Sequence, residues 1–242
     1  MTHTIHVHAE HEYEVVIGCD WQATLKHSLG SYTRVALVYS SAMRDQIKEF
    51  KPDNTEIHYF EVSDGEGAKT SQSLQSLWNW LGAAGFTRSD AIVGIGGGVA
   101  IDVAKYFAWR KNLPLFQCPT SMSVNAPFGH RSAVRDNGIL KYVGYAIPEM
   151  VYVDFDVIQS APEYINRSGV GDIVCYYTAK WDWEFATKTG KCEKKWPYDQ
   201  YWVDQASEVL NSVLNATSDI KAVNDKGVQT LMNALRWGGA AF

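Results

Sequence analysis

The residues best placed to do chemistry in this sequence are three consecutive glycines, Gly96, Gly97 and Gly98. They follow an apolar run at residues 91–93 and precede a helix-like pattern that continues to about residue 110. Glycines let the chain turn tightly and let a phosphate approach the backbone closely. The first N–H groups of a helix are unpaired and lie at the positive end of its dipole. The run therefore predicts either an anion site made by the backbone or a tight strand-to-helix turn without a ligand.

Other polar residues fall where neighbouring strands should end. Ser40 and Ser41 follow an apolar, β-branched run at residues 34–39, and Thr120 and Ser121 follow another short strand pattern. Strands that alternate with helices imply βαβ units and a mostly parallel sheet. Ligands of such sheets bind at the carboxyl ends of the strands. We therefore expect these hydroxyl groups and the glycine turn to lie along one edge of the sheet.

Hydrophobic periodicity predicts the elements that would position these groups. The predicted strands are residues 13–18, 34–39, 57–62, 91–94, 113–118 and 151–154, and the predicted helices are residues 21–29, 42–50 with Ser40 and Ser41 as the cap, 69–84, and the glycine turn to about 110. Asp136-Asn137-Gly138 predicts a hairpin turn. After Pro162 the pattern is helical, without a convincing strand. We predict an α/β fold: a Rossmann-like, mostly parallel sheet domain at residues 1–160, then an incomplete all-helical domain at residues 161–242.

Bulk composition argues against several classes of function. The net charge of -5 disfavours a nucleic-acid binder, and no apolar run approaches the length of a membrane span. The N-terminus lacks the pattern of a signal peptide. The four cysteines are widely spaced and are interpreted as reduced thiols: Cys19, Cys118, Cys175 and Cys192. We expect a cytoplasmic protein that acts on a small molecule, with no nucleic-acid or membrane partner.

The histidines are confined to the first part of the chain, and none follows His130. His3, His6 and His8 have the spacing of a terminal strand and could hold a metal or line a solvated strand face. We favour the solvated face, because we expect no carboxylate nearby to orient the imidazole rings.

Four motifs occur in a fixed order along the chain. They are Asp64-Gly65-Glu66-x-x-Lys69-Thr70, Gly96-Gly97-Gly98-x-x-x-Asp102-x-Ala104-Lys105, Pro119-Thr120-Ser121 and Gly169-x-Gly171-Asp172. This order resembles the superfamily that joins dehydroquinate synthases, glycerol-1-phosphate dehydrogenases and iron-containing alcohol dehydrogenases. The resemblance runs from about Tyr13 to the end of the chain. It implies an NAD(P)-binding domain joined to a helical metal-binding domain.

The motifs are less specific for a branch of the superfamily. Residues 13–18, Asp64-Gly65-Glu66, and Val124-Asn125 followed by Arg131 resemble the synthases, although those enzymes have an aspartate and a lysine at the last two places. Ala104-Lys105 and Gly171-Asp172-Ile173 resemble the dehydrogenases, in which the metal-binding acid is aspartate. The synthases also carry a lysine where this chain has Cys175. We therefore favour a dehydrogenase.

The resemblance implies a role for each matching residue in binding NAD or NADP. The glycines Gly96, Gly97 and Gly98 would hold the pyrophosphate, while Glu66 and Lys69 would face the ribose hydroxyls. Asp102, Thr120 and Ser121 would lie along the cofactor near the nicotinamide. The alternatives are an exposed Glu66–Lys69 pair in a first helical turn and a plain helix cap at Thr120.

The resemblance also implies a substrate pocket and a metal ligand. Asn125, Arg131 and Lys141 would line the pocket, although both cations could equally be solvated. Asp172 would be the first ligand of a divalent metal, zinc or iron. The implied reaction is a metal-assisted, NAD(P)-dependent oxidation or reduction of a polyol or polyol phosphate. The rival functions are a synthase-like sugar-phosphate cyclase and a non-catalytic dinucleotide-binding protein.

One departure from the superfamily affects the metal site. Its metal ligands include histidines downstream of the acid, and this chain has none there. A catalytic zinc needs about three protein ligands, so we expect the chain to be part of a longer enzyme or a natural truncation, able to form homo-oligomers. We expect the segment after Pro162 to expose apolar surface, with Trp181 and Trp183 serving in core and interface packing.

Overall fold

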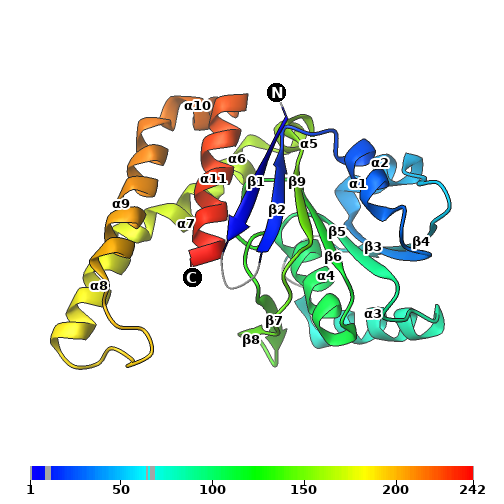
Figure 1. Ribbon diagram of the computed structural model, residues 1–242, viewed down its shortest axis with the longest axis horizontal. Helices are drawn as coiled ribbons and strands as arrows, with labels where there is room; N and C mark the ends of the chain where they lie inside the picture. The colour runs from blue at the N-terminus through cyan, green and yellow to red at the C-terminus, as the bar shows by residue number, and fades with distance from the viewer. Residues whose placement is uncertain (1, 9–11, 64, 66–68, 242) are drawn as a thin grey trace.

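The computed structural model describes residues 2–8, 12–63, 65 and 69–241 (Figure 1). Its main feature is a seven-stranded sheet with the strand order β1-β2-β9-β6-β5-β3-β4. The strands are β1 (His3–His8), β2 (Glu12–Ile17), β3 (Arg34–Ser40), β4 (Glu56–Val62), β5 (Ala91–Gly96), β6 (Leu115–Pro119) and β9 (Met150–Val153). Strand β1 pairs antiparallel with β2, whereas the other neighbouring strands pair in parallel. The predicted α/β class and mostly parallel sheet are confirmed.

Helices cover both faces of this sheet, because its central strands are apolar on both sides. The helices before the hairpin are α1 (Trp21–Leu29), α2 (Arg44–Glu49), α3 (Ser71–Ala83) and α4 (Gly98–Lys111). One buried cluster joins Leu25 and Ile47 to Leu37 of β3. A second cluster on the opposite face joins Leu77 and Phe107 to the sheet. The glycine turn thus lies at the junction of β5 with the helix that covers this second face.

The predicted helix at residues 42–50 is shorter and begins differently. A single 3-10 turn, η1 (Ser41–Met43), precedes α2, so the α-helix itself begins only at Arg44. Ser40 is the last residue of β3 and its side chain makes no cap hydrogen bond. The Ser40 side chain instead packs at the glycine turn, 3.1 Å from where a Cβ on Gly96 would lie. Ser40 thus stands at the N-cap position of the 3-10 turn η1 rather than of α2, and its side chain does not make the predicted cap bond.

A two-stranded hairpin is inserted between β6 and β9. It consists of β7 (Ser132–Asp136) and β8 (Ile139–Val143), which pair antiparallel. Asn137 and Gly138 have φ values of 51° and 78°, the left-handed backbone that a tight hairpin turn requires. The hairpin turn predicted from Asp136-Asn137-Gly138 is confirmed.

The rest of the chain is helical. Its helices are α5 (Phe155–Ser160), α6 (Glu163–Ser168), α7 (Val170–Val174), α8 (Tyr176–Lys188), α9 (Gln200–Asn215), α10 (Thr217–Ala222) and α11 (Asp225–Ala241). A third buried cluster joins Leu210 and Leu231 of these helices to Val15 and Val151 of the sheet. The helical part therefore shares a core with β2 and β9. The division of the chain near residue 160 stays a prediction.

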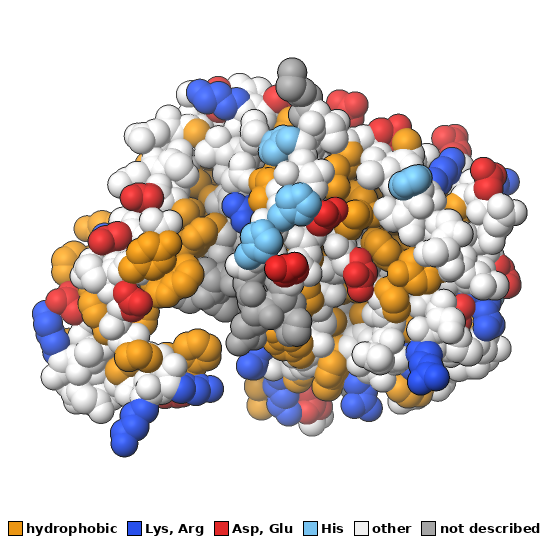
Figure 2. Space-filling view, viewed as in Figure 1, with side chains coloured by type: hydrophobic (Ala, Val, Ile, Leu, Met, Phe, Trp, Pro, Cys, Tyr) orange, Lys and Arg blue, Asp and Glu red, His pale blue; other side chains and the backbone are white. Residues whose placement is uncertain are grey.

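We call α8, α9 and the segment between them, residues 176–215, the arm. Figure 1 shows the arm on the side of the molecule away from α1 and α2, and Figure 2 shows a notch between the arm and the body, bordered by hydrophobic side chains. Large arm side chains are exposed, including Trp181 at 58% and Phe185 at 65%. The predicted apolar surface is present, but Trp181 does not pack in a core. None of the helices among the described residues is long and apolar enough to cross a membrane.

Candidate functional site

The glycines between β5 and α4 serve two different purposes. A Cβ on Gly94 would lie 2.9 Å from the Ala104 Cβ, and one on Gly96 would lie 2.9 Å from the Ala100 Cβ. These two glycines therefore let α4 pack directly on β5. A Cβ on Gly97 would meet Ser121 Oγ at 3.7 Å, an ordinary contact distance, so packing against α4 does not require a glycine at this position.

The N-terminus of α4 is not capped by a side chain. Gly97 is the N-cap residue, and it has no side chain to accept a bond from the first turn of this 14-residue helix. The first N–H groups of a helix have no acceptor inside the helix. The positive end of the helix dipole lies at this start, beside Gly97. A helix start of this kind favours an anion, so the residues present are compatible with the phosphates of a dinucleotide.

The end of β6 lies against the glycine turn. The Thr120 N–H donates to the Gly96 carbonyl oxygen at 3.1 Å. Ser121 is buried, and its hydroxyl donates to Ser123 Oγ at 3.2 Å. Bends and turns follow Thr120, so it does not cap a helix. The structure therefore brings Thr120 and Ser121 to the three glycines, as the parallel sheet predicts.

Lys69, Asp102 and Lys105 form a buried cluster of charges. Lys69 Nζ lies 2.9 Å from Asp102 Oδ2, and Lys105 Nζ lies 3.4 Å from Asp102 Oδ1. Burial lowers the pKa of the Lys105 ammonium, and the Asp102 carboxylate partly opposes this. The alternative of an exposed Glu66–Lys69 pair is wrong for Lys69, which is buried. Glu66 lies outside the described residues.

Both Asp102 oxygens therefore contact a lysine. The resemblance placed Asp102 along the cofactor, and this position stays a prediction. Sequence reasoning did not give Lys105 a site role. A lysine among the apolar residues Ile101, Ala104 and Ala108 could have indicated a buried, functionally placed charge, because the structure buries most of this helix.

The three predicted substrate residues lie in different surroundings. The Asn125 N–H donates to Asp172 Oδ2 at 3.0 Å. Arg131 is exposed, and its carbonyl oxygen accepts from Lys105 Nζ at 2.8 Å. Lys141 lies on β8, where it pairs with Asp136 at 2.6 Å. In the described part of the chain, no hydrogen bond or ion pair joins Lys141 to the other predicted site residues.

Asp172 lies in the first turn of α7 and is half-buried. Burial raises the pKa of its carboxyl group, and the hydrogen bond from the Asn125 N–H acts in the opposite direction. A buried carboxylate would favour a cationic partner. Among the described residues, however, no group of three or more His, Cys, Asp or Glu side chains is arranged to hold a metal. These residues do not fit a metal centre.

The N-terminal histidines do have carboxylate neighbours. His6 Nδ1 lies 3.0 Å from Glu14 Oε1, and His8 Nδ1 lies 3.1 Å from Glu12 Oε1, because the strand register sets these residues opposite each other. Figure 2 shows histidines beside acidic side chains on the face that carries β1 and β2. The expectation that no carboxylate lies near these histidines was wrong, because the sequence alone did not show that β1 pairs with β2. The exposed strand face is nevertheless what the structure shows.

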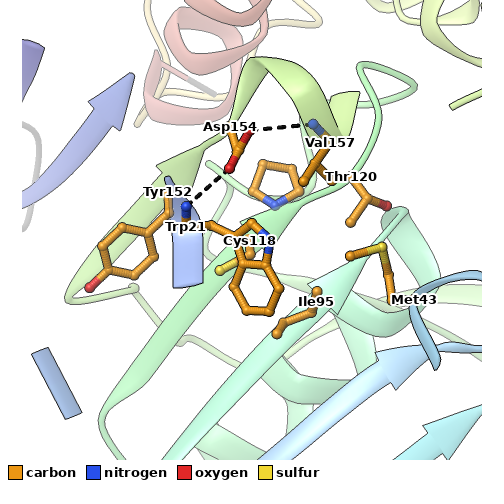
Figure 3. A pocket seen from close by; sticks show the side chains of 9 residues that line it. Trp21, Met43, Ile95, Cys118, Thr120, Tyr152, Asp154 and Val157 are labelled. Carbon is orange, nitrogen blue, oxygen red and sulfur yellow. Dashed lines mark hydrogen bonds between the residues drawn. The ribbon is translucent and has the colours of Figure 1, made fainter. Parts of the chain in front are cut away.

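A small hollow borders the other side of Thr120 (Figure 3). Asp154, just after β9, accepts hydrogen bonds from the Trp21 N–H at 3.0 Å and the Val157 N–H at 3.3 Å. The lining residues pack closely and leave no room for a water-sized molecule. The bonds of Asp154 therefore join α1 and α5 at the carboxyl edge of the sheet. The contact between Asp154 and Trp21 was not predicted from the sequence.

Comparison with known proteins extends the geometric result. The family described as iron-containing alcohol dehydrogenase matches residues 21–162, more than half of the chain. The 3-dehydroquinate synthase of Corynebacterium jeikeium is 29% identical over 182 residues, which cover 70% of this chain and 50% of that protein. The NAD(P)+-dependent glycerol-1-phosphate dehydrogenase of Geobacillus thermodenitrificans is 30% identical over 153 residues, which cover 63% of this chain and 37% of that protein. The matches thus span half or less of these two relatives.

Solved structures share the fold. The crystal structure of a probable glycerol dehydrogenase from Sinorhizobium meliloti superposes with a TM-score of 0.75. The superposition covers 93% of this chain and 65% of that chain, at 17% sequence identity. Since it includes most of the helical part, both the sheet and the following helices have the arrangement of this structure.

Proposed function

The chain belongs to the iron-containing alcohol dehydrogenase family, within the superfamily that includes glycerol-1-phosphate dehydrogenases and dehydroquinate synthases, and we propose that it forms the NAD(P)-binding part of a dehydrogenase acting on a polyol or polyol phosphate. The observation that carries this proposal is the uncapped N-terminus of α4 at Gly97. It supports dinucleotide binding, because backbone N–H groups at a helix start bind phosphate well.

The proposed roles follow from the contacts of each residue. The first turn of α4 and Gly97 would hold the pyrophosphate, with Thr120 and Ser121 on the neighbouring strand end. Asp102 would hold the Lys69 ammonium in place at 2.9 Å, and Lys69 would face the ribose hydroxyls. A bound nicotinamide supplies a hydride acceptor or donor for the substrate carbon. We derive no step through a metal, because the described residues do not form a site for one. Asp172 as a metal ligand stays a proposal.

Lys105 supports the dehydrogenase branch. By the resemblance, Ala104-Lys105 matches the dehydrogenases, whereas the synthases would have a small glycine in place of Lys105. Here the lysine ammonium donates to the carbonyl oxygens of Ala126 and Arg131 at 2.7 and 2.8 Å. A glycine would leave these contacts unmade, and this use of the lysine supports our preference for the dehydrogenase branch.

A synthase-like cyclase is the second candidate. The match to the synthase extends over 182 residues, against 153 for the dehydrogenase. A cyclase uses NAD transiently and eliminates phosphate, whereas a dehydrogenase accumulates NADH.

The test is to incubate the protein with NAD+ or NADP+ and a divalent metal, once with glycerol 1-phosphate and once with the substrate of dehydroquinate synthase. We expect NADH or NADPH to accumulate with glycerol 1-phosphate. Release of phosphate without net reduction of the cofactor would favour the cyclase. Dinucleotide binding without turnover on either compound would favour a non-catalytic binding protein.

A further inference from the structure

Lys105 lies on α4, the helix whose start carries the proposed pyrophosphate site. Its side chain is completely buried. A buried ammonium is costly unless its N–H groups are hydrogen-bonded and its charge is balanced. Lys105 must therefore have partners that offset this cost.

The contacts of Lys105 account for every donor that an ammonium has. Nζ donates to the carbonyl oxygens of Ala126 and Arg131 at 2.7 and 2.8 Å and lies 3.4 Å from Asp102 Oδ1. An ammonium carries three N–H donors and no acceptor. Asp102 supplies the negative charge, and two backbone carbonyl groups supply the shorter bonds.

The two carbonyl groups lie at the two ends of one turn, residues 126–131. Inside the turn, the Phe128 and Gly129 N–H groups both donate to the Asn125 carbonyl oxygen, at 2.9 and 3.3 Å. The turn thus begins next to Asn125 and ends at Arg131, the two substrate residues that the resemblance implies. The Asn125 N–H in turn bonds to Asp172.

We propose that Lys105 is a positioning residue that fastens the substrate turn, residues 126–131, to the dinucleotide helix α4. One ammonium holds both ends of the turn, so the places of Asn125 and Arg131 are set relative to the glycine turn. Lys105 touches neither substrate nor cofactor and acts through these backbone groups. The substrate part of this inference rests on the proposed function, whereas the fastening of the turn does not.

The test replaces Lys105 by methionine, which keeps most of the length and bulk of the side chain but removes the donors. Lys111→Met is the matched control, because Lys111 lies on the same helix, over the Trp78 ring and away from the turn. Three quantities are compared with wild type: hydrogen exchange of the Phe128 and Gly129 amides, the Kd for NADH, and the KM for glycerol 1-phosphate.

For Lys105→Met we expect exchange at Phe128 and Gly129 to be at least about tenfold faster, because the turn opens more often. The KM should rise by about tenfold or more while the Kd for NADH stays within about twofold. Lys111→Met should change none of the three. A general loss of structure would instead raise both constants together.

Unchanged exchange in a folded Lys105→Met protein would overturn the proposal, as would parallel losses of NADH and substrate affinity. If Lys105→Met does not fold, Lys105→Gln provides a neutral side chain with a shorter reach, and the same exchange increase is expected. Should the wild-type protein fail to bind NADH, the proposed function fails, and the exchange result alone decides whether Lys105 fastens the turn.

Discussion

The glycine turn before α4 and the arm differ in how completely their side chains are packed. Around the turn, Ala100, Ala104 and Lys105 are buried and the charged groups have partners. On the arm, Trp181 and Phe185 are mostly exposed although they are large and apolar. Exposed apolar patches of this kind mark interaction sites or favour self-association. The surroundings of the turn are thus closely packed, whereas the arm leaves large apolar side chains in contact with solvent.

The contact between Gly169 and the loop after β6 should be the most sensitive place to alter. A Cβ on Gly169 would lie 1.9 Å from the Met122 carbonyl oxygen, which belongs to the backbone beside the proposed cofactor site. We expect Gly169→Ala to lower the free energy of unfolding by about 3 kcal/mol, because neither backbone can move away without disturbing the core. Chemical denaturation measures this change.

Gly171→Ala is the matched control, since nothing lies within 4 Å of the added Cβ. It lies in the first turn of α7, the short helix whose N-cap residue is Gly169, and alanine favours a helix over glycine by up to about 1 kcal/mol. We expect it to be neutral or stabilising. Equal effects of the two substitutions would show that Gly169 and the loop after β6 do not touch as described.

Much of this comparison could be predicted from the sequence. Alternating strands and helices, the glycine turn and the Asn137-Gly138 hairpin depend on short-range patterns, and the structure contains all of them. The contacts that the sequence did not reveal join distant segments. Examples are the bonds from Lys105 to Ala126 and Arg131 and the pairing of His6 with Glu14.

Exposure was also hard to predict from composition. Trp181 and Trp183 are large apolar residues of the kind found in cores. Only the structure shows that Trp181 is exposed. The Trp183 indole N–H donates to the Trp196 carbonyl oxygen at 3.3 Å. Lys141 similarly matched a substrate position, yet its partner Asp136 is set by the hairpin register.

A smaller effect is expected at alkaline pH in the α/β half. Burial, with a lesser contribution from the Asp154 carboxylate, raises the pKa of Cys19 from 9.0 to about 11. A thiol whose pKa is raised on folding stabilises the folded state fully below pH 9, and this contribution is lost as pH rises to 11. The loss between pH 9 and 11 should be about 2 kcal/mol, because two pKa units correspond to roughly 2.8 kcal/mol in full and each state is only half ionised at its own pKa.

Measuring the free energy of unfolding across this pH range, for wild type and for Cys19→Ala, checks the prediction. The variant should lose less stability between pH 9 and 11 than wild type, whatever its stability at neutral pH. Parallel curves for wild type and Cys19→Ala would contradict the buried environment of this thiol.

The smallest change in stability is expected on the arm. Replacing Trp181 and Phe185 together by glutamine should alter the free energy of unfolding by less than about 0.5 kcal/mol, because both side chains are solvent-exposed. The same variant should bind less of a hydrophobic dye and self-associate less, as light scattering would show. A loss of several kcal/mol would mean that these rings are packed in solution.

Titration of NADH fluorescence with Gly97→Val tests the central claim most directly. The Gly97 backbone has φ -75°, which valine can adopt, so the variant should fold. The branched side chain would fill the space where a phosphate approaches α4, and we expect the affinity for NADH to fall by about thirtyfold or more. Gly82→Val, on α3 with open space around the added Cβ, should bind NADH like wild type. Unchanged NADH affinity in a folded Gly97→Val protein would contradict a dinucleotide site at the start of α4.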